Sequence, residues 1–142
     1  MAVKPSQLQP FWQGMYIVNS VHAVIVGLYA RRRHKFRRDF TYNKFHFGVF
    51  IQIGSALGIA AASKFGNPLI PGLLFLSTIG LTSFPAYLEG FKEVRNEPDL
   101  VIDEHGTMRR VGIYCFVLGW GLVYVKRRGS IPFLLPKLKN LL

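Results

Sequence analysis

Residues 11–30 read FWQGMYIVNSVHAVIVGLYA, twenty consecutive positions without a lysine, arginine, aspartate or glutamate. Two further uncharged runs, of nineteen and twenty residues, occupy positions 45–63 and 69–88. An α-helix rises about 1.5 Å per residue, so roughly 20 such residues cross a hydrocarbon core about 30 Å thick. Each of the three runs is therefore long enough to form a transmembrane helix.

A fourth apolar run, residues 111–125, is only fifteen residues long. It is bracketed by five basic residues, Arg109, Arg110, Lys126, Arg127 and Arg128. Their aliphatic stems can reach the membrane surface while the backbone continues inside the membrane. We therefore predict a fourth span that includes part of these basic flanks.

The four runs predict an all-α integral membrane protein, a bundle of four transmembrane helices with short loops, as a single membrane domain over residues 1–142. The predicted spans are 11–30, 45–63, 69–88 and 110–127, with a basic loop (31–44), an acidic connector (89–109) and an interfacial C-terminal segment (130–142). The alternative is a soluble helical domain, which would need polar helix faces. None of the runs carries a charged stripe at helical spacing, so we prefer the membrane interpretation.

The composition is typical of a membrane protein and excludes some kinds of site. Charged residues make up 18% of the chain, below the roughly one quarter of soluble domains. The net charge of +11 fits nucleic acid, an anionic membrane surface or an acidic partner. Because Cys115 is the sole cysteine, an intramolecular disulfide and a CxxC metal site are both excluded.

The stretch RRRHKFRR at residues 31–38 lies between the first two predicted spans. Basic residues in short loops mark the side of the membrane that is not translocated. No zinc-finger, helix-turn-helix or RNA-recognition pattern accompanies the stretch, so we expect no nucleic-acid partner. We predict instead that its basic side chains bind anionic phospholipid such as cardiolipin, at about 1 kcal/mol each. These side chains are Arg31, Arg32, Arg33, Lys35, Arg37 and Arg38.

The distribution of basic residues also predicts the orientation of the chain. The two loops on one side of the membrane carry eleven lysines and arginines, and the other side carries seven. By the positive-inside rule, both termini face away from the cytoplasm or the mitochondrial matrix.

Small residues predict where the helices pack closely. Gly54 and Gly58 form a GxxxG pair in the second run, and small residues at this spacing let helix backbones approach each other. In the fourth run we expect Gly119 and Trp120 to be packing residues. Pro71 and Pro85 bracket the third span, and they predict a kinked helix whose hydroxyl side chains satisfy its own freed carbonyl groups.

Three polar side chains within the spans are candidates for function: Asn19, His22 and Gln52. His22 is about 12 Å below the basic surface, whereas His46 is within about one turn of it, so the two histidines cannot ligate one haem. We therefore predict no cofactor. We expect His22, with Asn19, to form an interhelical hydrogen bond.

No catalytic or metal site is predicted. The sequence shows no nucleophile–base pair, phosphate loop or carboxylate dyad, so we expect a protein that is not an enzyme. Six of the seven acids lie between residues 89 and 110, in a segment interpreted as a solvated connector that could dock on another subunit.

Aromatic residues near the span ends predict a membrane-interface belt. They are Trp12, Tyr16, Tyr29, Tyr42, Tyr87, Tyr114 and Tyr124.

Short patterns recur at the starts and ends of the predicted helices. Residues 43–47 read NKFHF and residues 67–73 read NPLIPGL. The later positions are Leu81, Ser83, Tyr87 and Leu88, then Gly112, Phe116, Gly119 and Trp120. In this order the patterns resemble the transmembrane protein 256-like family, small four-helix membrane proteins of unknown function in bacteria and mitochondria. Val49 and Arg110 stand where that family has a histidine and a proline. The resemblance implies four spans and, in a eukaryote, the mitochondrial inner membrane, and it supplies no activity.

These features together predict a non-catalytic accessory subunit of a mitochondrial inner-membrane complex of the respiratory chain, with both termini on the intermembrane-space side. Its partners would be other membrane subunits and anionic phospholipid. The alternative is a free-standing small membrane protein that binds or transports a small ligand. Convergence of Asn19, His22 and Gln52 on an internal cavity would favour this alternative.

Overall fold

The computed structural model describes residues 5–31, 39–64, 67–94 and 106–128, and within these segments the secondary structure is helical, with no strand. The helices are α1 (Pro5–Ala30), α2 (Asp39–Lys64), α3 (Leu69–Thr78), α4 (Phe84–Val94) and α5 (Gly106–Arg128), and a π-helical turn, η2 (Ile79–Ser83), joins α3 to α4. The class predicted from the apolar runs, an all-helical chain, is confirmed.

Within the described residues, four helical stretches are long and apolar enough to cross a membrane. They are Gln9–Ala30, Thr41–Lys64, Leu69–Lys92 and Gly106–Lys126, the third of which combines α3, η2 and α4. The fourth predicted span is thus a helix of full length, although only fifteen of its residues form the uncharged run. The prediction of four candidate spans is confirmed.

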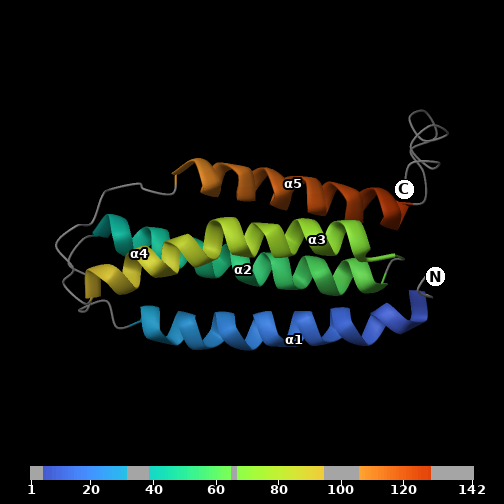
Figure 1. Cartoon of the computed structure of the whole chain (residues 1–142), viewed down its shortest axis with the longest axis horizontal. Coiled ribbons are helices and arrows are strands. Elements are labelled where there is room, and N and C mark those ends of the chain that lie inside the picture. The colour runs from blue at the N-terminus through green and yellow to red at the C-terminus, as the bar shows by residue number, and fades with distance from the viewer. Residues whose placement is uncertain (1–4, 32–38, 65–66, 95–105, 129–142) are drawn as a thin grey trace.

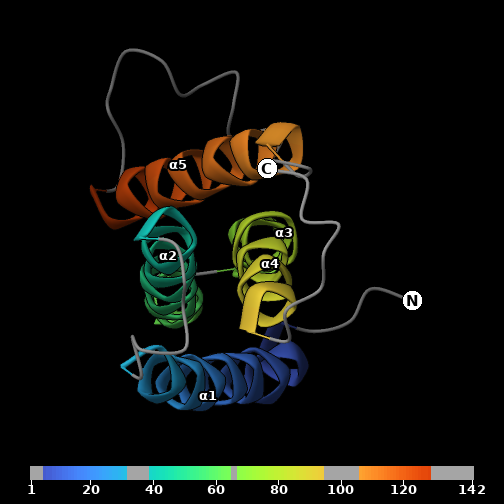
Figure 2. The same cartoon turned by 90° about the vertical axis from the view of Figure 1, so that its left-hand side faces the viewer.

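The helices are arranged in three layers. The second and third spans lie side by side in the middle, α1 covers one side of them, and α5 covers the other (Figure 1 and Figure 2). Only 22% of the first span and 17% of the fourth is buried, against 56% and 50% of the two central spans. The two outer helices therefore keep most of their surface for contact with whatever surrounds the bundle.

Basic residues lie at both ends of the bundle. At one end α1 and α4 finish and α2 and α5 begin (Figure 1). The described basic side chains near these helix ends are Arg31, Lys44, Lys92, Arg109 and Arg110. We call it the basic end. At the opposite end the described basic side chains are Lys64 and Lys126.

The helices extend beyond the uncharged runs, which corrects two predicted boundaries. Because α2 begins at Asp39, the last six residues of the predicted basic loop (31–44) are helical. Both ends of the predicted connector (89–109) are helical too, since α4 continues to Val94 and α5 begins at Gly106. Three of the charged residues in these helix ends, Lys44, Glu89 and Arg109, pair with one another. Residues 32–38, 95–105 and 129–142, which include the predicted interfacial segment, lie outside the described residues.

The π-helical turn η2 keeps the buried residues before and after it on one face of the third span. Four buried residues on this face follow each other at intervals of four: Phe75, Ile79, Ser83 and Tyr87. In a regular α-helix twelve residues make three full turns plus about 120°, so Tyr87 would point about 120° away from Phe75. The turn inserts about one extra residue, seen in the bond from the Phe84 N–H to the Ile79 carbonyl, and restores the alignment. Pro85 favours the turn because it lacks the N–H that would bind the Leu81 carbonyl.

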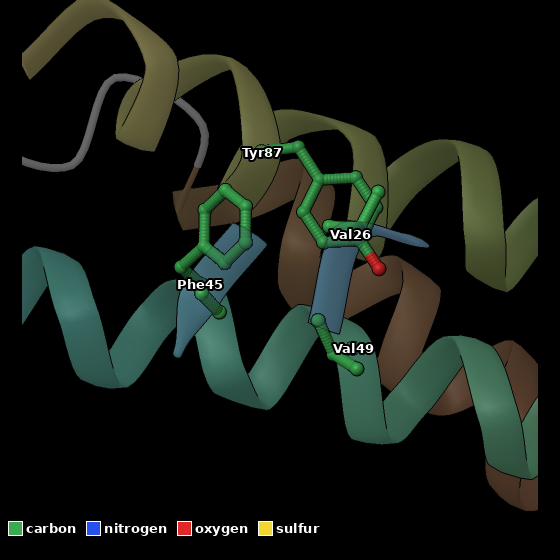
Figure 3. Close-up of a cluster of buried hydrophobic side chains, with 5 residues drawn as sticks. Val26, Phe45, Val49 and Tyr87 are labelled. Atoms are coloured by element: carbon green, nitrogen blue, oxygen red, sulfur yellow. The ribbon is translucent and has the colours of Figure 1, made fainter. Parts of the chain in front are cut away.

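Two hydrophobic clusters fill the interior of the bundle. The cluster at the basic end consists of Val26, Ala30, Phe45, Val49 and Tyr87, four of which are labelled in Figure 3. The cluster towards the opposite end consists of Trp12, Ile59, Ala62, Phe75 and Val123. Trp12 and Tyr87, predicted to lie in an interfacial belt, are only 1% and 3% exposed. They are therefore core residues.

Candidate functional site

Gln52 is the centre of a buried hydrogen-bonded group that joins three helices. Its side chain is fully buried, so its amide must find partners inside the protein. The Tyr87 hydroxyl donates to Gln52 Oε1 at 2.7 Å. Gln52 Nε2 lies 3.3 Å from Asn19 Oδ1 and 2.9 Å from His22 Nδ1. We call Asn19, His22, Gln52 and Tyr87 the Gln52 cluster.

The distances in this cluster define a consistent set of donors and acceptors. The amide nitrogen of Gln52 can donate its two hydrogens to Asn19 Oδ1 and His22 Nδ1. Its amide oxygen lies farther from His22 Nδ1, at 3.2 Å, and accepts from Tyr87. In this assignment His22 Nδ1 accepts the hydrogen bond from Gln52 Nε2. Asn19 Nδ2 donates to the Met15 carbonyl at 2.8 Å, so its amide also has partners on both sides.

The rings around His22 complete the cluster. Its imidazole packs edge-on against Phe84, with the ring centroids 5.9 Å apart, and is tilted against the Tyr87 ring at the same separation. The Tyr87 ring itself lies beside Phe45, Val26 and Val49 (Figure 3). The polar atoms are thus enclosed on one side by the hydrophobic cluster of the basic end. The structure brings together all three predicted intramembrane polar residues and adds Tyr87.

Hydroxyl groups of the third span bind the backbones of neighbouring helices. Thr78 Oγ1 donates to the Gly112 carbonyl of α5 at 3.0 Å, as well as to Leu74 in its own helix. Ser83 Oγ donates to the Gly48 carbonyl of α2 at 2.8 Å. The prediction that these groups satisfy their own helix was therefore wrong for Ser83 and incomplete for Thr78. Gly48 and Gly112 lack side chains, and this lets the third span come close enough to both helices for these bonds.

Phe75 of α3 occupies the space that three helices leave between them. A Cβ atom added to Gly58 of α2 would overlap its ring, and one added to Gly119 of α5 would lie 2.9 Å from it. The Trp120 ring packs edge-on against Phe75, with the centroids 5.6 Å apart. Gly54 faces a different ring, that of Phe116. The four predicted packing residues thus all lie against aromatic rings.

Glu89 forms a buried ion-pair cluster at the basic end. Its Oε2 atom lies 3.2 Å from Lys44 Nζ of α2 and 3.5 Å from Arg109 Nη1 of α5. The residue is only 6% exposed, so its assignment to a solvated connector was wrong. The sequence held one signal for this placement, since Glu89 directly follows an uncharged run. In the structure the helix continues through Glu89.

The other predicted site residues are only partly described. Arg31 is exposed at the basic end, and its backbone N–H donates to the Gly27 carbonyl at 3.2 Å. Arg32, Arg33, Lys35, Arg37 and Arg38 lie outside the described residues, so binding of phospholipid by the basic loop stays a prediction. Among the described side chains there is no group of three His, Cys, Asp or Glu residues that could hold a metal ion.

Two cavities lie at opposite ends of the bundle. The first, of about 320 Å³, is at the basic end between α2 and α5. It is lined by Asn43, Lys44, Phe47, Gly106, Arg109, Arg110 and Ile113, and we call it the basic cavity. The second, of about 260 Å³, lies between α1 and the end of α2, beside Trp12, Tyr16 and Lys64. Neither of these two cavities is lined by the Gln52 cluster.

Comparison of the chain with known protein families, with curated proteins and with solved structures finds no match. The resemblance to the transmembrane protein 256-like family therefore stays a prediction that rests on the residues quoted for it.

Replacing Gln52 by leucine is expected to lower the free energy of unfolding by about 1–3 kcal/mol, because Tyr87, His22 and Asn19 would lose their shared partner. Hydrogen bonds between membrane helices are individually weak, which favours the lower part of this range. Unfolding in mixed micelles, followed by helical circular dichroism, measures the change. Gln13→Leu, at an exposed position of α1, is the matched control. A Gln52→Leu variant as stable as this control would show that the cluster contributes nothing.

Proposed function

We propose that this protein is a non-catalytic accessory subunit of a mitochondrial inner-membrane complex of the respiratory chain. It acts by packing its helices against neighbouring subunits and by contacting anionic phospholipid such as cardiolipin. The observation that carries the proposal is the surface of the two outer helices. It is extensive, apolar and little covered by the rest of the bundle.

The outward surface of α1 is suited to packing against another helix. Its exposed large side chains are Phe11, Ile17, Val18, Val21, Val24, Ile25 and Leu28. Five of these are valine or isoleucine, whose branched side chains have few rotamers to lose. Ordering them against a partner therefore costs less entropy than ordering long flexible side chains. On α5 the exposed set is Met108, Val111, Tyr114, Val117, Leu118 and Tyr124.

The buried polar groups support a structural role. Every side-chain heteroatom of Gln52 is used in bonds within the bundle, and Thr78 and Ser83 bind the backbones of adjacent helices. Such bonds hold helices in one arrangement in a membrane, where unsatisfied polar groups are costly. The protein therefore offers its partners a bundle with fixed faces.

The proposed orientation follows from the basic end. Because arginine and lysine favour the non-translocated side, we place this end at the matrix surface and both termini in the intermembrane space. The resemblance to the transmembrane protein 256-like family supports the mitochondrial location.

A second candidate function is the binding or transport of a small ligand by a free-standing protein. The convergence of Asn19, His22 and Gln52 with Tyr87 favours it. These groups already satisfy one another, so a ligand would have to exchange bonds with them. Ligand-dependent stabilisation that is lost in a His22→Leu variant, with Gln13→Leu unchanged, would support this candidate.

Native gel electrophoresis of mildly solubilised membranes, with mass spectrometry of the band that contains this chain, tests the proposed function. Migration with a complex of several hundred kilodaltons that contains respiratory subunits is the expected result. Migration near the chain's own mass of 16.1 kDa plus detergent would overturn the accessory-subunit proposal.

A further inference from the structure

We propose that the basic cavity binds one anionic phospholipid, with the phosphate held by Lys44, Arg109 and Arg110 and an acyl chain lying along Phe47 and Ile113. This site lies between α2 and α5 and is separate from the basic loop of residues 31–38. It concerns a lipid bound to the chain itself, so it stands whether or not the chain belongs to a complex.

The cations of the site lie near the starts of two candidate membrane spans. Lys44 is three residues inside the second span, which begins at Thr41, and Arg109 and Arg110 are three and four residues inside the fourth, which begins at Gly106. These offsets correspond to about 5 Å below the start of each span. All three side chains line one cavity near the starts of these spans, which is where a headgroup phosphate would lie in a membrane-spanning bundle.

The charge of the site favours an anion. Among the described residues, the cavity lining contains three basic residues and no acid. Glu89, beside the cavity, pairs with two of these bases, Lys44 and Arg109, through one carboxylate oxygen. Arg110 is exposed, and its guanidinium can form paired hydrogen bonds with a phosphate. The first turn of α5, which begins at Gly106 in the lining, adds the positive end of a helix dipole.

The apolar part of the cavity distinguishes a lipid from a free phosphate. Phe47 and Ile113 each lie three residues deeper than a basic residue of the lining, which is about 4.5 Å towards the membrane centre. A layer of cations above a layer of apolar side chains matches the order of phosphate and acyl chain in a glycerophospholipid. An acidic peptide or free phosphate would leave the deeper layer without a partner.

Native mass spectrometry of the full chain, released from detergent micelles that contain defined lipids, tests the site. The probes are phosphatidylglycerol, phosphatidylcholine and glycerol 3-phosphate, the last being a headgroup without acyl chains. We expect one retained phosphatidylglycerol, at least about tenfold weaker retention of phosphatidylcholine, and no displacement of the lipid by glycerol 3-phosphate. Arg110→Gln should weaken retention about fivefold, the effect of one basic residue near a membrane surface.

Three further variants make this result specific. Asn43→Trp fills the cavity from an exposed position without changing any charge, and it should reduce retention more than about tenfold through steric exclusion. Lys92→Gln removes a charge in the last turn of α4, at the same end but outside the cavity lining, and Lys64→Gln removes one at the opposite end. Both should leave retention unchanged. Thermal unfolding of each variant shows that the fold is intact.

Four outcomes would overturn the site. Equal losses in Lys92→Gln and Arg110→Gln would mean diffuse attraction to a basic surface, and unaltered retention in Asn43→Trp would place the lipid elsewhere. Retention of phosphatidylcholine as strong as that of phosphatidylglycerol would show that the cavity does not recognise the charge of the lipid. Displacement by glycerol 3-phosphate would identify a site for soluble phosphate. Retention of the lipid by a chain that migrates alone on a native gel would overturn the accessory-subunit proposal and leave this site standing.

Discussion

Replacement of Glu89 by glutamine is expected to lower the free energy of unfolding by about 3–5 kcal/mol, because it removes one member of a buried charge cluster. The carboxylate lies between Lys44 and Arg109, whose side chains are only 14% and 13% exposed. Without it, two cations from different helices would face each other with little water to screen them. Glutamine has nearly the same shape as glutamate, so a loss of stability would reflect the missing charge and not a change in packing. Unfolding in mixed micelles, followed by circular dichroism, measures it.

Two control variants separate this effect from a general change in charge. Arg31→Gln changes one charge at the same end of the bundle on an exposed side chain, and should alter stability by less than about 0.5 kcal/mol. Replacing all three cluster members together, as Lys44→Met, Glu89→Leu and Arg109→Met, should recover most of the loss, since a well-packed apolar group can substitute for a buried ion pair. A Glu89→Gln variant as stable as Arg31→Gln would contradict the buried cluster.

Replacement of Phe75 by alanine is expected to cost about 3–5 kcal/mol, the range found for large aromatic side chains in packed interiors. The ring is fully buried and contacts Gly58 of α2 and Gly119 of α5. Its removal would leave a cavity where three helices meet, and the glycines around it have no side chains to fill the space. Leu73→Ala, on the same helix and 52% exposed, is the matched control and should have a much smaller effect.

A double-mutant cycle shows whether Phe75 and Gly58 are in contact. Gly58→Leu alone should destabilise the protein by about 1–3 kcal/mol, because the new side chain would overlap the Phe75 ring. In the Phe75→Ala background the same leucine has room and should restore part of the lost stability. Additive effects of the two substitutions would show that α2 and α3 do not meet at these residues.

The number of candidate membrane spans could be predicted from the sequence, because each uncharged run corresponds to one span. The helix ends could not be predicted in this way. Lys44 and Glu89 are charged, and a search for uncharged runs assigns such residues to loops, although they lie inside α2 and α4. Their burial depends on a partner that is distant in the sequence. Lys44 and Glu89 carry opposite charges and form an ion pair, so each compensates the buried charge of the other.

The polar cluster shows a similar limit. Asn19, His22 and Gln52 were identified as candidates because polar side chains are rare within apolar runs. The sequence does not give the rotation of one helix relative to another, and this rotation determines that all three face the same point. Tyr87 was assigned to the interfacial belt because it lies near the end of an uncharged run. Its buried position depends on the π-helical turn, which changes the direction that residues after Ser83 face.

The π-helical turn has a consequence for how the length of this chain can vary. Because η2 contains about one residue more than a regular helix needs, the loss of one residue between 79 and 83 would convert it to ordinary α-helix and leave both flanks facing their present neighbours. The same loss elsewhere in the third span would rotate every later residue by about 100°. Tyr87 and Glu89 would then leave the interior. A one-residue deletion in this span is thus expected to be compatible with the fold at this turn and not elsewhere in the span.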